Sequence, residues 1–246
     1  MEKHQKTIGV VLAEYAYGEN GKRLSLLTKE LGRVTAFAKG AKKAKSPLLA
    51  ASQLFVFANF ELYKGKEAYT LTGAEVIESF YSIRSQIELT AMAAYFSELS
   101  LNFTREEMGS QRLLKLIYLS FEEMEKARTP LPQLKAVFEL KLLSLLGYLP
   151  EVSQCIGCGR EEDLSAVSLP ECGMVCLHCM TKKEEKVSKP VRQAMQYVQD
   201  SPVEKVFRFR LRDDYEMEFS RLASKIMSCH LDFPLKSERF LKEIGF

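Results

Sequence analysis

The stretch RLSLLTKELGRVTAFA, residues 23–38, decides how the first third of this chain folds. It holds two short runs of strand-forming residues, 23–27 and 34–38, on either side of a break that contains Gly32. Alternating runs bounded by glycine are typical of β-strands joined by a turn. The stretch therefore predicts two strands and the turn between them.

Three more runs of the same kind surround this stretch, at 8–12, 55–62 and 69–76. Turn-forming residues stand in the other breaks, namely Gly18, Asn20, Gly21 and Gly65. Five strands within residues 7–78 are too closely spaced for crossover helices, so we expect a small antiparallel barrel. The five-stranded OB-fold is the best-known barrel of that size.

Beyond Ser79 the apolar period changes from two to about 3.6 residues, which indicates helices. The first predicted helix is long and carries apolar residues at 83, 87, 92, 95, 96 and 99. Further helices are expected at 111–126, 132–146, 189–199, 215–229 and 237–244. The helix at 132–146 is apolar almost all round, so it should lie at the centre and end at Gly147. Ser188, just before Lys189 and Pro190, is expected to cap the helix that follows it.

Six cysteines include two Cys-x-x-Cys pairs, Cys155 with Cys158 and Cys176 with Cys179, which are 17 residues apart. Two such turns at this spacing are typical of a zinc site in which four thiolates close a tetrahedron. A closed site leaves no position for water, so we expect one structural zinc ion.

Three alternatives at the cysteines stay open. The four residues could be buried free cysteines or a redox pair, which the paired spacing disfavours. Cys172 lies four residues before Cys176 and could replace a ligand, as could His178. Cys229 is remote in sequence, lies on an apolar helix face and is expected to be plain core.

The predicted fold class is therefore α+β, with a five-stranded OB-fold barrel followed by an α-helical domain that carries an inserted four-cysteine zinc finger. The expected boundaries are 1–79 for the barrel, 80–150 and 188–246 for the two parts of the helical domain, and 151–187 for the zinc finger. No apolar run approaches the ~20 residues that span a bilayer, and the polar start at residues 1–6 does not resemble a signal peptide. We expect a cytoplasmic protein.

Positive charge is concentrated between Gly21 and Pro47, where eight basic residues face Glu30 alone and give +7 in a chain whose net charge is +3. Small residues separate the lysines of the run 39–47, which suits a loop lying along phosphates, although such runs are often only solvated. The candidate DNA contacts are Arg23, Lys29, Arg33, Lys39, Lys42, Lys43 and Lys45. The aromatic residues available for base stacking, most of them expected in the core, are Tyr15, Tyr17, Phe37, Phe55, Phe57, Phe60, Tyr63 and Tyr69.

Nothing in the sequence indicates a catalytic centre. The three histidines fall at a terminus (His4), beside a cysteine turn (His178) and at a helix end (His230), with no obvious partner acid or nucleophile, and the common nucleotide and metalloprotease motifs are absent. The acids at 213, 214, 216 and 218 stand beside Arg208, Arg210 and Arg212, and we expect a solvated, charge-paired surface there rather than a metal site. We therefore expect a protein that is not an enzyme.

Several motifs in order resemble the family of bacterial recombination mediators called RecO. They are the sequence 26–32 (LLTKELG), the basic loop 38–43 (AKGAKK) with 46–48 (SPL), the run 139–150 leading into Cys155-x-x-Cys158-Gly159, and 236–241 near the end. The resemblance implies an OB-fold, a helical domain and a zinc module. It also implies binding of single- and double-stranded DNA, annealing of complementary strands, partnership with RecR, and help for RecA in displacing single-strand-binding protein. Such a protein would associate with the nucleoid.

Two functions of other classes remain as alternatives. One is a zinc-dependent RNA-processing or nuclease-like enzyme, which would need a second, open metal site. The other is a protein-interaction scaffold in which the positive loop has no ligand.

Overall fold

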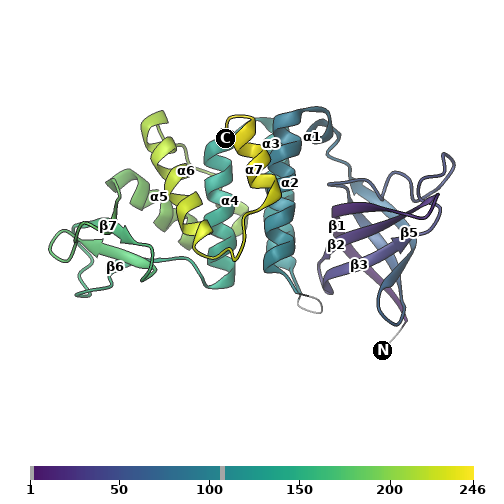
Figure 1. The fold of residues 1–246 in the computed structure, drawn as a ribbon, viewed down its shortest axis with the longest axis horizontal. Coiled ribbons are helices and arrows are strands. Elements are labelled where there is room, and N and C mark those ends of the chain that lie inside the picture. Colours follow the sequence, from purple (N-terminus) through teal and green to yellow (C-terminus); the bar gives the residue numbers. More distant parts are fainter. Residues whose placement is uncertain (1–2, 106–108) are drawn as a thin grey trace. The chain divides into compact units, whose positions relative to one another are not determined.

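The computed structural model describes residues 3–105 and 109–246. The chain forms two compact units, one made of Met1–Glu125 with Leu235–Phe246 and the other of Lys126–Pro234 (Figure 1). The first unit therefore contains two segments far apart in the sequence. No helix among the described residues is long and apolar enough to cross a membrane.

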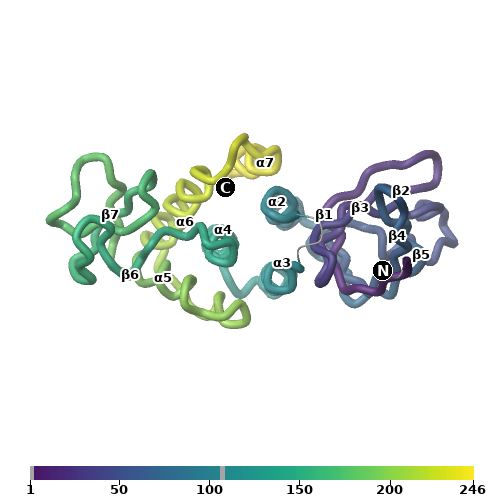
Figure 2. The backbone as a smooth tube through the Cα atoms, turned by 90° about the horizontal axis from the view of Figure 1, so that it is seen from below, coloured from purple at the N-terminus to yellow at the C-terminus, as the bar shows by residue number. Residues whose placement is uncertain are grey.

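Five strands at the start of the first unit close into a barrel in the order β1-β2-β3-β5-β4, and Figure 2 shows the path of their backbone. They are β1 (His4–Tyr17), β2 (Gly21–Thr28), β3 (Gly32–Ala38), β4 (Phe57–Lys64) and β5 (Tyr69–Glu78). The predicted OB-like barrel is confirmed. Neighbouring strands are antiparallel except β3 and β5, which pair in parallel. That parallel pair closes the barrel and departs from the expected antiparallel pattern.

Alternation fixes which side chains fill the barrel. Leu24 and Leu26 of β2 and Val34 and Ala36 of β3 point inward and are buried, so the residues between them face outward. The long strand β1 pairs with β4 from His4 to Val10 and with β2 from Gly9 to Tyr17, and its register against β2 shifts between Val11 and Ala13. Such a bulge bends a strand, which is what a small closed barrel requires.

Four helices complete the first unit: α1 (Tyr81–Ser85), α2 (Ile87–Phe103), α3 (Gln111–Lys126) and α7 (Lys236–Glu243). The single long helix predicted after residue 79 is wrong, because Gln86 adopts an extended conformation and separates α1 from α2. Ile87, assigned to the apolar face, is consequently 58% exposed. Arg84 explains the break, since its guanidinium donates to the carbonyls of Leu54 and Ser79 and fastens α1 to the barrel end.

The second unit is built around α4 (Leu131–Leu146), which packs against α5 (Lys189–Asp200) and α6 (Asp213–Ser228). Its helix α4 is buried along nearly its whole length, which confirms the predicted central helix, and Gly147 ends it in the left-handed conformation. Ser188 occupies the expected N-cap position of α5 but does not cap the helix with its side chain. The carboxylate of Glu218 accepts the Ser188 N–H instead.

A four-stranded sheet in the order β6-β8-β7-β9 carries the cysteines. Its strands are β6 (Glu151–Cys155), β7 (Leu164–Ser168), β8 (Gly173–Cys176) and β9 (Glu185–Lys186). None of them was predicted, because they are too short to show a period in the sequence.

Candidate metal centre and nucleic-acid interface

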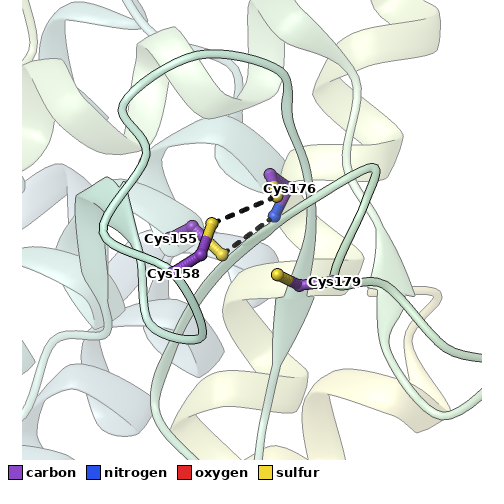
Figure 3. Close-up of side chains that lie close together, drawn as sticks. All are labelled: Cys155, Cys158, Cys176 and Cys179. Atoms are coloured by element: carbon purple, nitrogen blue, oxygen red, sulfur yellow. Dashed lines mark hydrogen bonds between the residues drawn. The ribbon is translucent and has the colours of Figure 1, made fainter.

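The four predicted ligand cysteines come together (Figure 3). Cys155 ends β6 and Cys176 ends β8, and the parallel pairing of these strands places both chain turns at one edge of the sheet. Cys158 and Cys179 lie in the turns that follow. The four sulfur atoms all lie within 4.8 Å of one another, and those of Cys158 and Cys176 are 3.7 Å apart. Tetrahedral zinc–thiolate bonds of about 2.3 Å place neighbouring sulfurs roughly 3.8 Å apart, so the geometry suits such an ion.

Electrostatics in this cluster also favour a cation. Burial raises the pKa of the Cys155 thiol, but N–H groups of Cys176, Cys158 and Gly157 outweigh it and lower the pKa to about 6. The neighbouring thiols of Cys158 and Cys176 raise the pKa of Cys179 to about 12. A positive charge among the sulfur atoms would favour the ionised form of the Cys179 thiol, which its neighbours disfavour. The four cysteines fit a metal ion that keeps all four thiols ionised. Four thiolates would fill its tetrahedral coordination sites and leave none for a substrate.

The two alternative ligands lie outside this cluster. Cys172 is exposed in the left-handed conformation, and its thiol donates to the carbonyl of Leu169. The imidazole of His178 does not belong to the cluster of four sulfur atoms. The expectation that Cys229 belongs to the core is wrong, because α6 ends at Ser228 and leaves Cys229 exposed beyond the apolar face of the helix.

Four of the candidate DNA contacts gather on the loop after β3. Lys39, Lys42, Lys43 and Lys45 are all exposed, and no ion pair involves them within the described part of the chain. The loop is held in place because the Lys42 N–H donates to the carbonyl of Asn20, in the turn between β1 and β2. The lysines therefore project from a fixed loop.

Lys29 and Arg33 stand at the other end of β3. Six residues of extended chain separate Arg33 from Lys39, a distance of about 20 Å. The guanidinium of Arg33 donates to the Leu101 carbonyl of α2 at 2.8 Å, and its backbone N–H donates to Arg105. Lys29 lies 3.5 Å from the carboxylate of Glu30. These two cations are not brought together with the loop lysines.

The structure sorts the aromatic residues, which the sequence could not do. Phe55, Phe57 and Phe60 are buried, whereas Tyr15 and Tyr17 are each 50% exposed. Register places Tyr15 of β1, Arg23 of β2 and Phe37 of β3 in one row across the outer face of the barrel.

Within that row the Arg23 guanidinium lies 4.6 Å from the centre of the Tyr15 ring. Tyr17 packs against Phe37 with ring centres 4.5 Å apart. We call Tyr15, Tyr17, Arg23 and Phe37 the barrel platform. Its residue Phe37 adjoins the basic loop in the chain, since β3 ends at Ala38 and the loop begins at Lys39.

Comparisons with known proteins agree in every part of the chain. The family description "Recombination protein O N terminal" matches residues 1–80, and "Recombination protein O C terminal" matches residues 84–239. The chain is 34% identical to the DNA repair protein RecO of Acetivibrio thermocellus over 243 residues, covering 97% of this chain and 96% of that one. It is 30% identical to the DNA repair protein RecO of Alkaliphilus metalliredigens, covering 92% and 94%. It is 29% identical to the DNA repair protein RecO of Caldicellulosiruptor saccharolyticus, covering 98% and 99%.

Proposed function

The chain belongs to the RecO family, and from this premise we propose that it is a non-enzymatic DNA-binding mediator of recombinational DNA repair. In this proposal it binds single- and double-stranded DNA and anneals complementary strands in the cytoplasm, at the nucleoid. With RecR it helps to load RecA onto DNA that single-strand-binding protein covers. The family relationship supports these roles, and the following surfaces would carry the DNA binding.

The barrel platform and the basic loop together form the proposed DNA site. Bases stack on exposed aromatic rings whatever their sequence, and an arginine over such a ring adds a cation–π contribution. The row of Tyr15, Arg23 and Phe37 offers both kinds of contact on one face. Lysines of the adjoining loop would neutralise phosphates and release counterions. This juxtaposition is the observation on which the proposal chiefly rests.

Two of the seven candidate contacts receive a different role. Arg33 already donates to a helix carbonyl and stands about 20 Å along β3 from the loop lysines, so we propose that it joins the barrel to α2. Lys29 shares that end of the strand. The proposed DNA contacts are accordingly Arg23, Lys39, Lys42, Lys43 and Lys45.

We propose that the four-cysteine cluster holds one zinc ion. Four thiolates are the donor set that structural zinc prefers, and a closed tetrahedron supplies folding free energy rather than a reactive water. Cys155, Cys158, Cys176 and Cys179 would hold it and fasten the β6 and β8 turns together.

One experiment separates this function from an enzyme or a scaffold. Fluorescently labelled single and double strands are incubated with the metal-replete chain, and binding, annealing and product length are followed together. Binding and annealing with intact strands support the mediator. Cleaved strands would establish the enzyme, and a complete lack of binding at low salt would establish the scaffold.

A further inference from the structure

A segment of alternating arginines and apolar residues leads into α6. Phe207, Phe209 and Leu211 are half-buried, whereas the three residues between and after them, Arg208, Arg210 and Arg212, are exposed. The segment belongs to no helix or strand and lies between the short 3-10 helix η1 (Val203–Lys205) and α6. A turn at residues 206–207, closed by a bond from the Arg208 N–H to the Lys205 carbonyl, precedes it. From Arg208 on, alternate burial and the extended conformation of Arg212 place the arginines on one face. We call these three residues the arginine row.

The backbone of this segment is fixed by a buried side chain of α4. Gln133 is fully buried, its Nε2 donates to the Phe209 carbonyl at 2.8 Å, and its Oε1 accepts from the Leu211 N–H at 3.0 Å. These atoms flank Arg210 and are the ones that a neighbouring strand would bond. The Phe209 ring also packs against Tyr197 and Phe219, with centres 5.2 and 6.1 Å away. The row is therefore held in one conformation before any ligand arrives.

The arginines make no close ion pair with the acids beside them: within residues 3–105 and 109–246 no carboxylate oxygen lies within 4 Å of a nitrogen of Arg208, Arg210 or Arg212. The expected charge pairing is seen only at longer range, where burial raises the pKa of Glu216 and the charge of Arg210 acts to lower it. Asp213 and Asp214 lie in the first turn of α6, where negative charge is stabilised by the helix dipole. Arg210 donates one bond to a backbone carbonyl, that of Arg128, which orients it without removing its charge.

We propose that the arginine row is a second phosphate-binding surface and that its ligand is the backbone of a nucleic acid strand. This inference rests on the proposed DNA-binding function and adds a site on the other compact unit. Successive arginines of an extended chain stand about 6.6 Å apart, a repeat that suits successive phosphates of an extended strand. Guanidinium groups bind phosphate through paired, charge-assisted hydrogen bonds.

The row fits a nucleic acid better than an acidic peptide. Its apolar neighbours are half-buried, and its exposed side chains are three arginines at a regular two-residue spacing, which matches the evenly repeated charge of a phosphate backbone. A chain that holds one strand on the barrel platform and another on the arginine row has the two ligands that annealing must bring together.

The test is a stoichiometric titration of the full chain with a short labelled single strand. The row variant Arg208→Gln/Arg210→Gln/Arg212→Gln is compared with a platform variant, Tyr15→Ala/Tyr17→Ala. A matched control, Lys182→Gln/Lys183→Gln/Lys189→Gln, removes the same charge from exposed positions of the same unit. Wild type and control should bind two strands per chain, the row variant should bind one, and the platform variant should bind two with the affinity for one of them about tenfold lower. The row variant should also anneal strands on the order of tenfold more slowly, having lost three phosphate contacts.

The outcomes are distinguishable. A row variant that still binds two strands and anneals like the control overturns the second site, while weaker binding of one strand in the platform variant preserves the proposed function. Loss of binding of a glutamate-rich peptide, with both strands retained, overturns the proposal in favour of a protein partner. A wild-type chain that binds no strand overturns both proposals. Thermal unfolding of each variant verifies that the changes at exposed positions leave the fold intact.

Discussion

Arg23 lies with its guanidinium 4.6 Å from the centre of the Tyr15 ring, on the outer face of the barrel. The two residues are direct cross-strand partners of β1 and β2. Because the pair is exposed, the arginine is oriented by the ring and keeps its charge available to a ligand. The predictions below begin with this pair.

Removing the exposed tyrosines should weaken binding of single strands without changing its dependence on salt. Each lost stacked base is worth roughly 1–3 kcal/mol, so Tyr15→Ala/Tyr17→Ala should lower affinity about tenfold or more. Fluorescence anisotropy with a labelled oligonucleotide measures this. The control is Tyr81→Ala, which removes an exposed tyrosine ring that is not part of the barrel platform. Equal affinities for the two variants would count against the platform.

Reversing the charge of the basic loop should flatten the salt dependence. The slope of log affinity against log salt should change by about 2 in Lys39→Glu/Lys42→Glu/Lys43→Glu, at roughly 0.7 per lost phosphate on a single strand. Titrations at several salt concentrations give the slope. An unchanged slope in the triple variant would show that the loop is not a DNA contact.

Arg33→Ala should affect stability more than DNA binding. The substitution leaves the Leu101 carbonyl of α2 without its charged donor, a loss of about 1–3 kcal/mol in the free energy of unfolding. Denaturant unfolding measures the loss, and the salt slope should remain that of the wild type. A large change in slope with unchanged stability would return Arg33 to the DNA site.

Loss of one thiolate should release the metal. Cys176→Ser should lower zinc content and thermal stability, because structural zinc supplies on the order of 10 kcal/mol of apparent binding free energy. Cys172→Ser should change neither, since its thiol lies outside the cluster. Elemental analysis of the purified variants and their melting temperatures decide the matter. Zinc retained in Cys176→Ser but lost in Cys172→Ser would reassign the ligands.

Glu98 should hold the helix α7 on α2. Its carboxylate accepts from the N–H of Ser237 at 2.8 Å and from that of Lys236 at 3.3 Å, so it caps the start of α7 from another helix. Glu98→Ala should therefore speed amide hydrogen exchange in residues 236–243 while the barrel strands exchange as before. Glu88→Ala, near the start of α2, is the control and should leave this exchange unchanged.

The sequence predicted those parts whose residues repeat with a regular period. The five barrel strands and most of the helices followed from it. The cysteine cluster followed as well, because paired Cys-x-x-Cys turns have few other uses. What it could not provide was pairing between distant segments. Tyr15 and Phe57 look alike in a strand pattern, and only the register of β1 against β2 and β4 shows that one is exposed and the other buried.

Single polar contacts were equally hidden. Gln86 interrupts a helix although the apolar period continues across it. The break accompanies two hydrogen bonds that Arg84 donates, to the carbonyls of Leu54 and Ser79. Gln133 reads in the sequence as one polar residue in an apolar helix, and its role depends on a segment 76 residues away. Such bonds have no local signature, since the partner is defined only by the completed fold.

The first unit is interrupted by the second, and this sets an order of events during synthesis. The ribosome delivers the barrel and α2 first, then the whole of Lys126–Pro234, and only afterwards the helix that Glu98 caps from 139 residues earlier. Until then the α2 surface that α7 covers is open to the solvent and to other nascent chains. A premature stop codon just ahead of Leu235 would therefore leave the second unit fully translated, while the first unit would permanently lack the helix α7.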